Sequence, residues 1–149
     1  VGLSPYEIFN NFDQAAQDQL ARKLKALEKL GLDELAILFD DMRSDIPNLA
    51  QIQADIMHWV RDHTDIPRLS VCPSYYSDDP VLDRVFGERP ADYLETLGRA
   101  LDPSIHVFWT GEEVCSREIS PGHLKRVGAP RGMPPGWLVM PSTRRCSRH

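Results

Sequence analysis

Short runs of apolar residues alternate along this chain with longer segments in which apolar residues recur every three or four positions. Unbroken apolar runs are typical of parallel strands that are buried on both faces. The three-to-four spacing is typical of helices that bury one side. Four segments are expected to be strands, the first of them entered near its end: residues 1–4, 35–39, 68–73 and 105–109.

Helices are predicted between these strands. Leucines recur on one face of a helix between residues 14 and 30, and Gly31 supplies a C-terminal stop. A second helix is expected to open at residues 45–47, with Pro47 near its first turn and a buried apolar stripe that ends at Val60. Further helix starts are expected at Pro80, Pro90 and Ser120-Pro121.

The spacing of these elements predicts an α/β fold. The strands recur about 35 residues apart with helical sequence between them, which is the size of a βαβ unit. About four consecutive β-α units make roughly half of an eight-unit barrel, whose usual length is about 250 residues. We therefore expect a partial (β/α)8 TIM barrel, with a doubly wound parallel sheet as the alternative.

The last part of the chain departs from this pattern. Residues 129–149 contain four of the twelve prolines and four arginines but no acidic residue. We therefore expect residues 1–128 to be part of a barrel domain. Residues 129–149 are expected to be an atypical tail that is non-native or disordered.

Composition and charge narrow the possible functions. The chain is 42% hydrophobic and 26% charged, which is typical of a folded domain, and its net charge of -5 offers no basic surface for nucleic acid. It has no apolar run of about 18 residues that could span a membrane. Cys72, Cys115 and Cys146 are odd in number and far apart, so they suit neither a disulfide framework nor a metal site. Reduced cysteines weakly favour the cytoplasm.

Reactive side chains follow three of the expected strands. Asp40 and Asp41 directly follow the first long apolar run, Tyr76 lies shortly after the next strand, and Thr110 follows the third. The carboxyl ends of parallel strands converge on one face of a barrel, and this face is where barrel enzymes place their catalytic residues. The acid pair is therefore a candidate site, with an acidic loop that caps the next helix as the simpler interpretation.

Three ordered motifs at these strand ends resemble one enzyme family. Residues 38–41, 72–76 and 109–119, with residues 3–5 before them, resemble the family 84 glycoside hydrolases in order and spacing. This family comprises β-N-acetylglucosaminidases and includes the O-GlcNAcases. The resemblance covers roughly residues 1–128 and identifies that segment as part of a glycoside hydrolase catalytic barrel.

The resemblance implies a retaining hydrolase of β-linked N-acetylglucosamine that needs no cofactor or metal. Asp40 would orient the acetamido group of the substrate, whose oxygen attacks the anomeric carbon and forms an oxazoline. Asp41 would be the general acid and later the general base. Tyr76 would help to hold the acetamido group, and the residues near the sugar would be Thr110, Val114 and Cys72. The implied partner is a glycoconjugate or glycoprotein that carries N-acetylglucosamine.

Elementary chemistry adds two requirements to this assignment. Adjacent side chains on a strand point to opposite faces, so the backbone must leave strand geometry near Asp41 if both acids are to reach one sugar. Two neighbouring carboxylates cannot ionise equally easily, so one of them is expected to keep its proton near neutral pH.

The family pattern fails after residue 128. The family continues there with a Trp-Asp-Asn motif and an Asn-Asp pair, which this sequence lacks, and the family's early strands are not matched either. The chain alone is therefore expected to be poorly stable and to have little or no activity. Two other functions stay open. One is a non-catalytic carbohydrate-binding or interaction fragment, and the other is a magnesium-dependent enzyme that uses Asp40, Asp41 and Asp45.

Overall fold

Five parallel strands form one sheet in the order β1-β2-β3-β4-β5. The computed structural model describes residues 1–6, 8–41, 45–116, 122 and 137–139 of the 149-residue chain. The strands are β1 (Gly2–Leu3), β2 (Glu34–Leu38), β3 (Arg68–Cys72), β4 (His106–Trp109) and β5 (Trp137–Val139).

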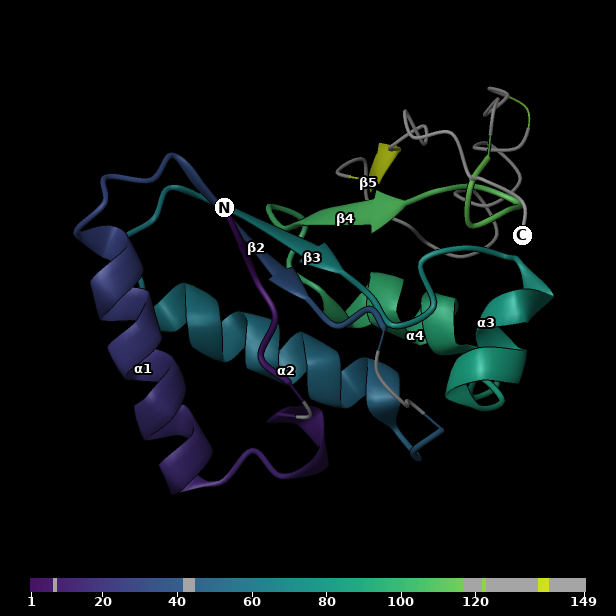
Figure 1. Ribbon diagram of the computed structural model, residues 1–149, viewed down its shortest axis with the longest axis horizontal. Coiled ribbons are helices and arrows are strands. Elements are labelled where there is room, and N and C mark those ends of the chain that lie inside the picture. Colours follow the sequence, from purple (N-terminus) through teal and green to yellow (C-terminus); the bar gives the residue numbers. More distant parts are fainter. Residues whose placement is uncertain (7, 42–44, 117–121, 123–136, 140–149) are drawn as a thin grey trace.

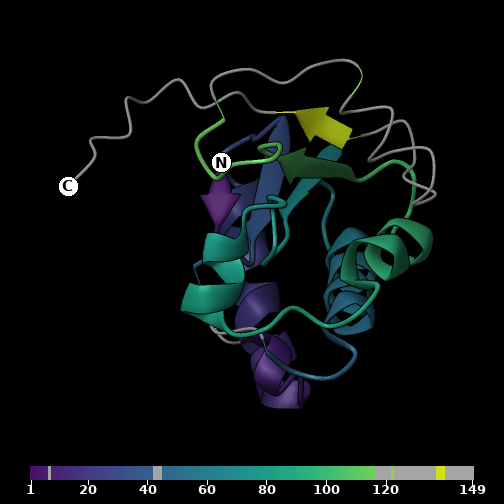
Figure 2. The same ribbon diagram turned by 90° about the vertical axis from the view of Figure 1, so that its right-hand side faces the viewer.

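Helices connect the strands and cover one side of the sheet. They are α1 (Gln14–Glu28), α2 (Leu49–Asp62), α3 (Pro80–Phe86) and α4 (Tyr93–Ala100), with a short 3-10 helix, η1, at Ile8–Asn10. Figure 1 shows α1, α2 and α4 along one side of the sheet, and α3 at the end towards which the strands point. Figure 2 shows that the sheet formed by these strands is curved.

This topology is that of a barrel segment. A doubly wound sheet reverses its strand order at a switch point and carries helices on both sides. Here the strands follow the order of the sequence without a reversal, and the helices α1, α2 and α4 share one side. The prediction of a partial (β/α)8 barrel with about four β-α units is therefore confirmed.

Alternate residues of β2 face the helices. In β2, Leu35 and Ile37 are fully buried, whereas the alternating residues Ala36 and Leu38 are only half-buried. We call the side of the sheet that bears Ala36 and Leu38 the inner face, because it corresponds to the interior of a closed barrel. The helix-facing core also includes the following buried residues: Leu24, Phe39, Leu49, Ile56, Met57, Val60, Val71, Leu97, Val107 and Trp109.

The ends of the helices follow local capping rules with one correction. The Asp13 side chain accepts a hydrogen bond from Ala16 N at 3.0 Å and caps α1, which ends at Glu28. The second helix begins at Leu49, so the prediction that residues 45–47 open it is wrong, and Pro47 lies two residues before the first turn. Asn48 takes the N-cap position with φ 58°. Asparagine tolerates this left-handed conformation, and its position separates the proline from the helix.

The region after residue 128 is described only in part. The backbone of β5 pairs in parallel with β4, with Val107 opposite Trp137 and Trp109 opposite Val139. The other residues of 129–149, and the helix start expected at Ser120-Pro121, lie outside the described residues. The boundary at residue 128 and the atypical tail stay predictions.

Gly87 occupies a backbone conformation that other residues avoid. It follows α3 with φ 97° and ψ 161°, and an added Cβ would lie 2.5 Å from Cβ of Asp45. We expect Gly87→Ala to lower the free energy of unfolding by about 2–4 kcal/mol, because strain and overlap add. Gly31→Ala is the matched control. Gly31 has φ 65° with no atom within 4 Å of an added Cβ, so its cost is about 1–2 kcal/mol. Equal urea midpoints for the two variants would contradict the prediction.

Candidate active site

The acid pair lies at the carboxyl end of β2. The backbone N–H of Phe39 donates to the Cys72 carbonyl at 2.9 Å, so pairing with β3 continues one residue beyond the strand. Phe39 is fully buried towards the helices. The strand alternation then places Asp40 on the inner face with Leu38, and Asp40 is half-buried.

The backbone leaves strand geometry at Asp41. This residue has φ 57°, which is the left-handed region, and its side chain is exposed. The change of direction frees the Asp41 side chain from the helix-facing side that strand alternation would give it. The expectation of a break in strand geometry at this position is confirmed.

The groups at these strand ends influence one another's ionisation. Burial, followed by the charge of Asp41, raises the pKa of the Asp40 carboxyl. Burial raises the pKa of Tyr76 to about 12, and both carboxylates add to this shift. Burial and the same two carboxylates also raise the pKa of the Cys72 thiol, which is therefore protonated at neutral pH. The ends of β2 and β3 thus bring four of the predicted site residues into one environment.

Hydrogen bonds connect the loops that follow β3 and β4. The backbone N–H of Thr110 donates to the Tyr76 carbonyl at 3.0 Å. The Thr110 hydroxyl donates to the Glu113 carbonyl at 3.1 Å. These bonds fix the position of Tyr76 relative to the loop that carries Val114. The structure therefore brings Thr110 and Val114 to the same end of the sheet as the acid pair.

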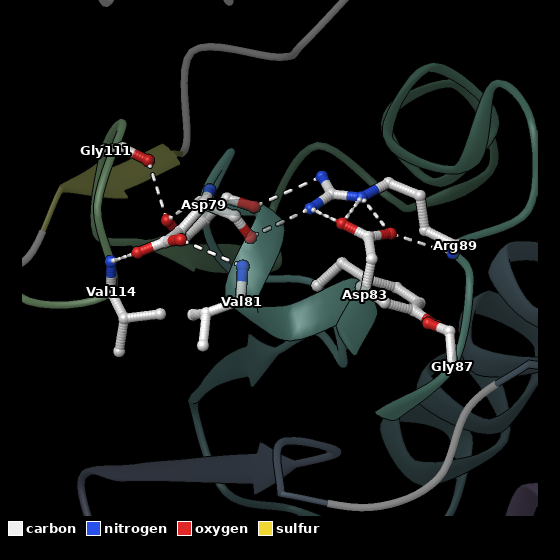
Figure 3. A network of polar contacts seen from close by, with 9 residues as sticks. Asp79, Val81, Asp83, Gly87, Arg89, Gly111 and Val114 are labelled. Atoms are coloured by element: carbon white, nitrogen blue, oxygen red, sulfur yellow. Dashed lines mark hydrogen bonds and ion pairs between the residues drawn. The ribbon is translucent and has the colours of Figure 1, made fainter. Parts of the chain in front are cut away.

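Asp79 is the centre of a polar network between these loops (Figure 3). One carboxylate oxygen accepts a hydrogen bond from Val81 N at 2.9 Å and caps α3. The other accepts from Val114 N at 3.3 Å. The Ser77 hydroxyl donates to the Gly111 carbonyl at 3.0 Å and accepts from Asp79 N at 3.1 Å. This network holds the residue 114 segment against the start of α3.

Arg89 supports the same loop from the other side of α3. It forms an ion pair with Asp83 at 2.9 Å and donates to the Ser77 carbonyl at 3.2 Å. Its guanidinium also lies 5.1 Å from the centre of the Tyr75 ring. Asp79 and Arg89 were not among the predicted site residues. The Asp79-Pro80 pair carried a helix-cap signal, but nothing local indicated that its carboxylate reaches the loop after β4.

Neither a metal site nor a membrane span is found in the described part of the chain. Among those residues, no group of three or more His, Cys, Asp or Glu side chains could hold a metal ion. Asp45, the third acid of the magnesium interpretation, lies against Gly87 after α3. No described helix is long and apolar enough to cross a membrane.

Comparison with known proteins assigns the family. A family model described as beta-N-acetylglucosaminidase matches residues 2–138. This chain belongs to that family. The resemblance to the family 84 glycoside hydrolases, drawn from three motifs, is therefore confirmed.

Two curated relatives and one solved structure show how much of a family member this chain represents. Protein O-GlcNAcase of Mus musculus and that of Rattus norvegicus are each 29% identical over 117 residues, covering 72% of this chain and 12% of theirs. A structure of an O-GlcNAc hydrolase mutant of Thermobaculum terrenum superposes with a TM-score of 0.67 and 25% identity. That match covers 93% of this chain and 31% of the other. The chain thus spans about an eighth of the length of these curated relatives.

Proposed function

We propose that this β-N-acetylglucosaminidase family chain is part of a retaining, substrate-assisted glycosidase barrel. The substrate class is a glycoconjugate or glycoprotein with β-linked N-acetylglucosamine, as in the O-GlcNAc hydrolase relatives. Residues 1–128 would be the main barrel segment, and β5 pairs with its last strand from beyond that boundary. The observation that carries the proposal is the pair of consecutive acids at the carboxyl end of β2, where the left-handed Asp41 breaks the strand alternation. Barrel enzymes place their catalytic residues at this end of the strands.

The first half of the reaction uses the substrate's own amide as the nucleophile. The Asp40 carboxylate accepts a hydrogen bond from the acetamido N–H, which increases electron density on the acetamido oxygen. That oxygen bonds to the anomeric carbon while the bond to the leaving oxygen breaks, and Asp41 donates a proton to the leaving group. An oxazoline forms in its protonated state, with its N–H still hydrogen-bonded to the Asp40 carboxylate and without a covalent bond to the protein, as in other substrate-assisted glycosidases.

The second half returns the proton. Asp41, now ionised, takes a proton from a water molecule that attacks the anomeric carbon and opens the oxazoline. Each half inverts the anomeric carbon, so the β configuration is retained. One residue thus acts first as acid and then as base.

The electrostatics of the ligand-free site support different roles for the two acids. The raised pKa of Asp40 makes its carboxylate a more basic acceptor for the acetamido N–H than an ordinary aspartate. Asp41 is exposed, so its carboxyl group is accessible to the leaving oxygen and later to a water molecule.

The neighbouring residues suit the binding of a neutral sugar. With a pKa of about 12, Tyr76 keeps its hydroxyl proton and donates a hydrogen bond to the acetamido group. Cys72 contributes a neutral thiol to the inner face. Thr110 and Val114 would flank the sugar from the loop after β4.

The reaction class is tested with a pair of aryl substrates and the complete polypeptide that the gene encodes. We expect 4-nitrophenyl β-N-acetylglucosaminide to be hydrolysed with retention of the β configuration, and NMR of the product measures this configuration. We expect 4-nitrophenyl β-glucoside to react at least about 10³-fold more slowly. It lacks the acetamido oxygen, so no nucleophile within the substrate can attack the anomeric carbon. Similar rates for both sugars would contradict substrate assistance. Saturable binding of N-acetylglucosamine without hydrolysis would show a binding protein instead.

The 149-residue chain by itself is expected to have little or no activity. It covers 31% of the solved relative that it resembles, and a partial barrel leaves strand edges and an inner face without partners. Its turnover of the same aryl substrate is measured beside that of the complete polypeptide. Equal turnover per molecule would contradict this proposal.

A further inference from the structure

A buried chain of polar groups runs from α4 to the residue before Asp40. The Tyr93 hydroxyl donates to the Gln53 amide oxygen. The Gln53 amide nitrogen donates to the Ser74 hydroxyl at 2.8 Å, and this hydroxyl donates to the Phe39 carbonyl at 2.8 Å. Gln53, Ser74 and Tyr93 are 0%, 1% and 2% exposed. Each donor has an acceptor, so the hydrogen bonds run in one direction and the Ser74 hydroxyl is held in one orientation.

The end of this chain of hydrogen bonds fixes a particular peptide group. The Phe39 carbonyl belongs to the peptide bond that joins Phe39 to Asp40. The N–H of Phe39 is already held by the Cys72 carbonyl at 2.9 Å. The Ser74 hydroxyl therefore fixes the orientation of the peptide plane between Phe39 and Asp40, where the chain leaves the sheet.

The next residue makes this anchor necessary. Asp41 has φ 57°, a left-handed conformation that costs most residues with a Cβ about 1–2 kcal/mol and that aspartate adopts more readily than most but still uncommonly. A strained turn persists only where the surrounding structure holds it, and such turns cluster at functional sites. Ser74 is a hydrogen-bond donor in a core that is otherwise mostly apolar, and it contacts the residue that precedes this turn.

We propose that Ser74 is a positioning residue for Asp40 and Asp41, and that Gln53 and Tyr93 orient its hydroxyl. This inference rests on the proposed function, because it assigns a role in the reaction of those two acids. Ser74 does not contact the substrate in this proposal. It acts through the Phe39 carbonyl by keeping both carboxylates in the geometry of the transition state.

The central experiment compares Ser74→Ala with Ser74→Thr in the complete polypeptide. A misplacement of about 1 Å can cost about 10²-fold in rate, so we expect Ser74→Ala to lower kcat by about 10- to 100-fold. KM should change by less than about threefold, because most of the sugar-binding contacts remain. Ser74→Thr keeps the hydroxyl and should recover most of kcat.

A double-mutant cycle tests the orienting role of the amide and covers the case in which threonine does not fit. Gln53→Met removes the donor to Ser74 at similar volume, and it should lower kcat in the same direction. The double variant should be no slower than Ser74→Ala, because Gln53 acts through Ser74. The matched control is Thr64→Val. Thr64 lies before β3, at the opposite end of the sheet, and its hydroxyl donates a hydrogen bond to Glu28 Oε1 at 2.8 Å. This substitution should leave kcat unchanged.

Three results would overturn the positioning role. The first is an unchanged kcat for Ser74→Ala with only a lower urea midpoint. The second is a Ser74→Thr variant that folds but is as slow as Ser74→Ala. The third is a double variant whose loss in kcat is the product of the Ser74→Ala and Gln53→Met losses. Asp40→Asn in the same polypeptide separates this failure from that of the proposed function. Full activity of Asp40→Asn would contradict both the proposed function and the positioning role. A low kcat for Asp40→Asn together with a wild-type kcat for Ser74→Ala would contradict the positioning role alone.

Discussion

Asp41→Asn is expected to lower kcat of the complete polypeptide by about 10²–10⁴-fold on substrates with poor leaving groups, which is the usual contribution of general acid–base catalysis. Asparagine has nearly the same shape as aspartate but can neither donate a proton to the leaving oxygen nor take one from water. The exposed position of Asp41 makes a folding defect an unsuitable explanation for such a loss. The measurement is kcat and kcat/KM for a series of aryl β-N-acetylglucosaminides with leaving groups of increasing acidity.

The leaving-group series identifies the role as well as the residue. A 2,4-dinitrophenyl leaving group departs without a proton, so kcat/KM for that substrate should be nearly unchanged in Asp41→Asn. Poor leaving groups should show the full loss. The matched control is Asp33→Asn, which alters an exposed aspartate just before β2, at the opposite end of the same strand. A uniform loss across the series, or an equal loss in Asp33→Asn, would contradict the acid role.

The location of the acid pair and a break in strand geometry beside it could be predicted, but the backbone conformation of that break could not. The apolar run at 35–39 and the helical periods around it placed Asp40 and Asp41 at the carboxyl end of a strand, and β2 spans Glu34–Leu38. Strand alternation could also have placed position 40 on the inner face with Leu38. The left-handed φ of Asp41 could not have been inferred, because aspartate adopts this conformation more often than most residues but still only in a minority of cases.

The supporting contacts of the site were missed because they join residues that are far apart in the sequence. Ser74 reaches the carbonyl of Phe39 across 35 positions, and Asp79 reaches Val114 across 35 positions. Helical and strand periodicity report only on neighbours within a few residues. Likewise, the general rule that one of two adjacent acids has a raised pKa did not say which one. The answer depends on burial, and the half-buried Asp40 is the group whose pKa is raised.

Asp40→Asn is expected to lower kcat by about 10²–10³-fold, which is the typical cost of removing one electrostatic contact to the reacting group. The variant should also lose the acid limb of the pH profile. Wild-type activity requires ionised Asp40, so it is present above the pKa of this residue and is lost as the pH falls through it. Burial and the Asp41 charge raise that pKa from 3.8, so the limb lies at a higher pH than for an ordinary aspartate. The measurement is kcat/KM against pH, which reports groups of the free enzyme.

The Asp41→Asn variant tests the origin of this limb. Its activity on the 2,4-dinitrophenyl substrate does not need the acid, so kcat/KM can still be followed against pH. Because the Asp41 carboxylate is one cause of the raised pKa of Asp40, its removal should move the acid limb to lower pH. Asp33→Asn should leave the limb in place. An acid limb that stays fixed in Asp41→Asn, or that persists in Asp40→Asn, would show that another group controls it, and Asp40 would then lose its role as the acceptor of the acetamido N–H.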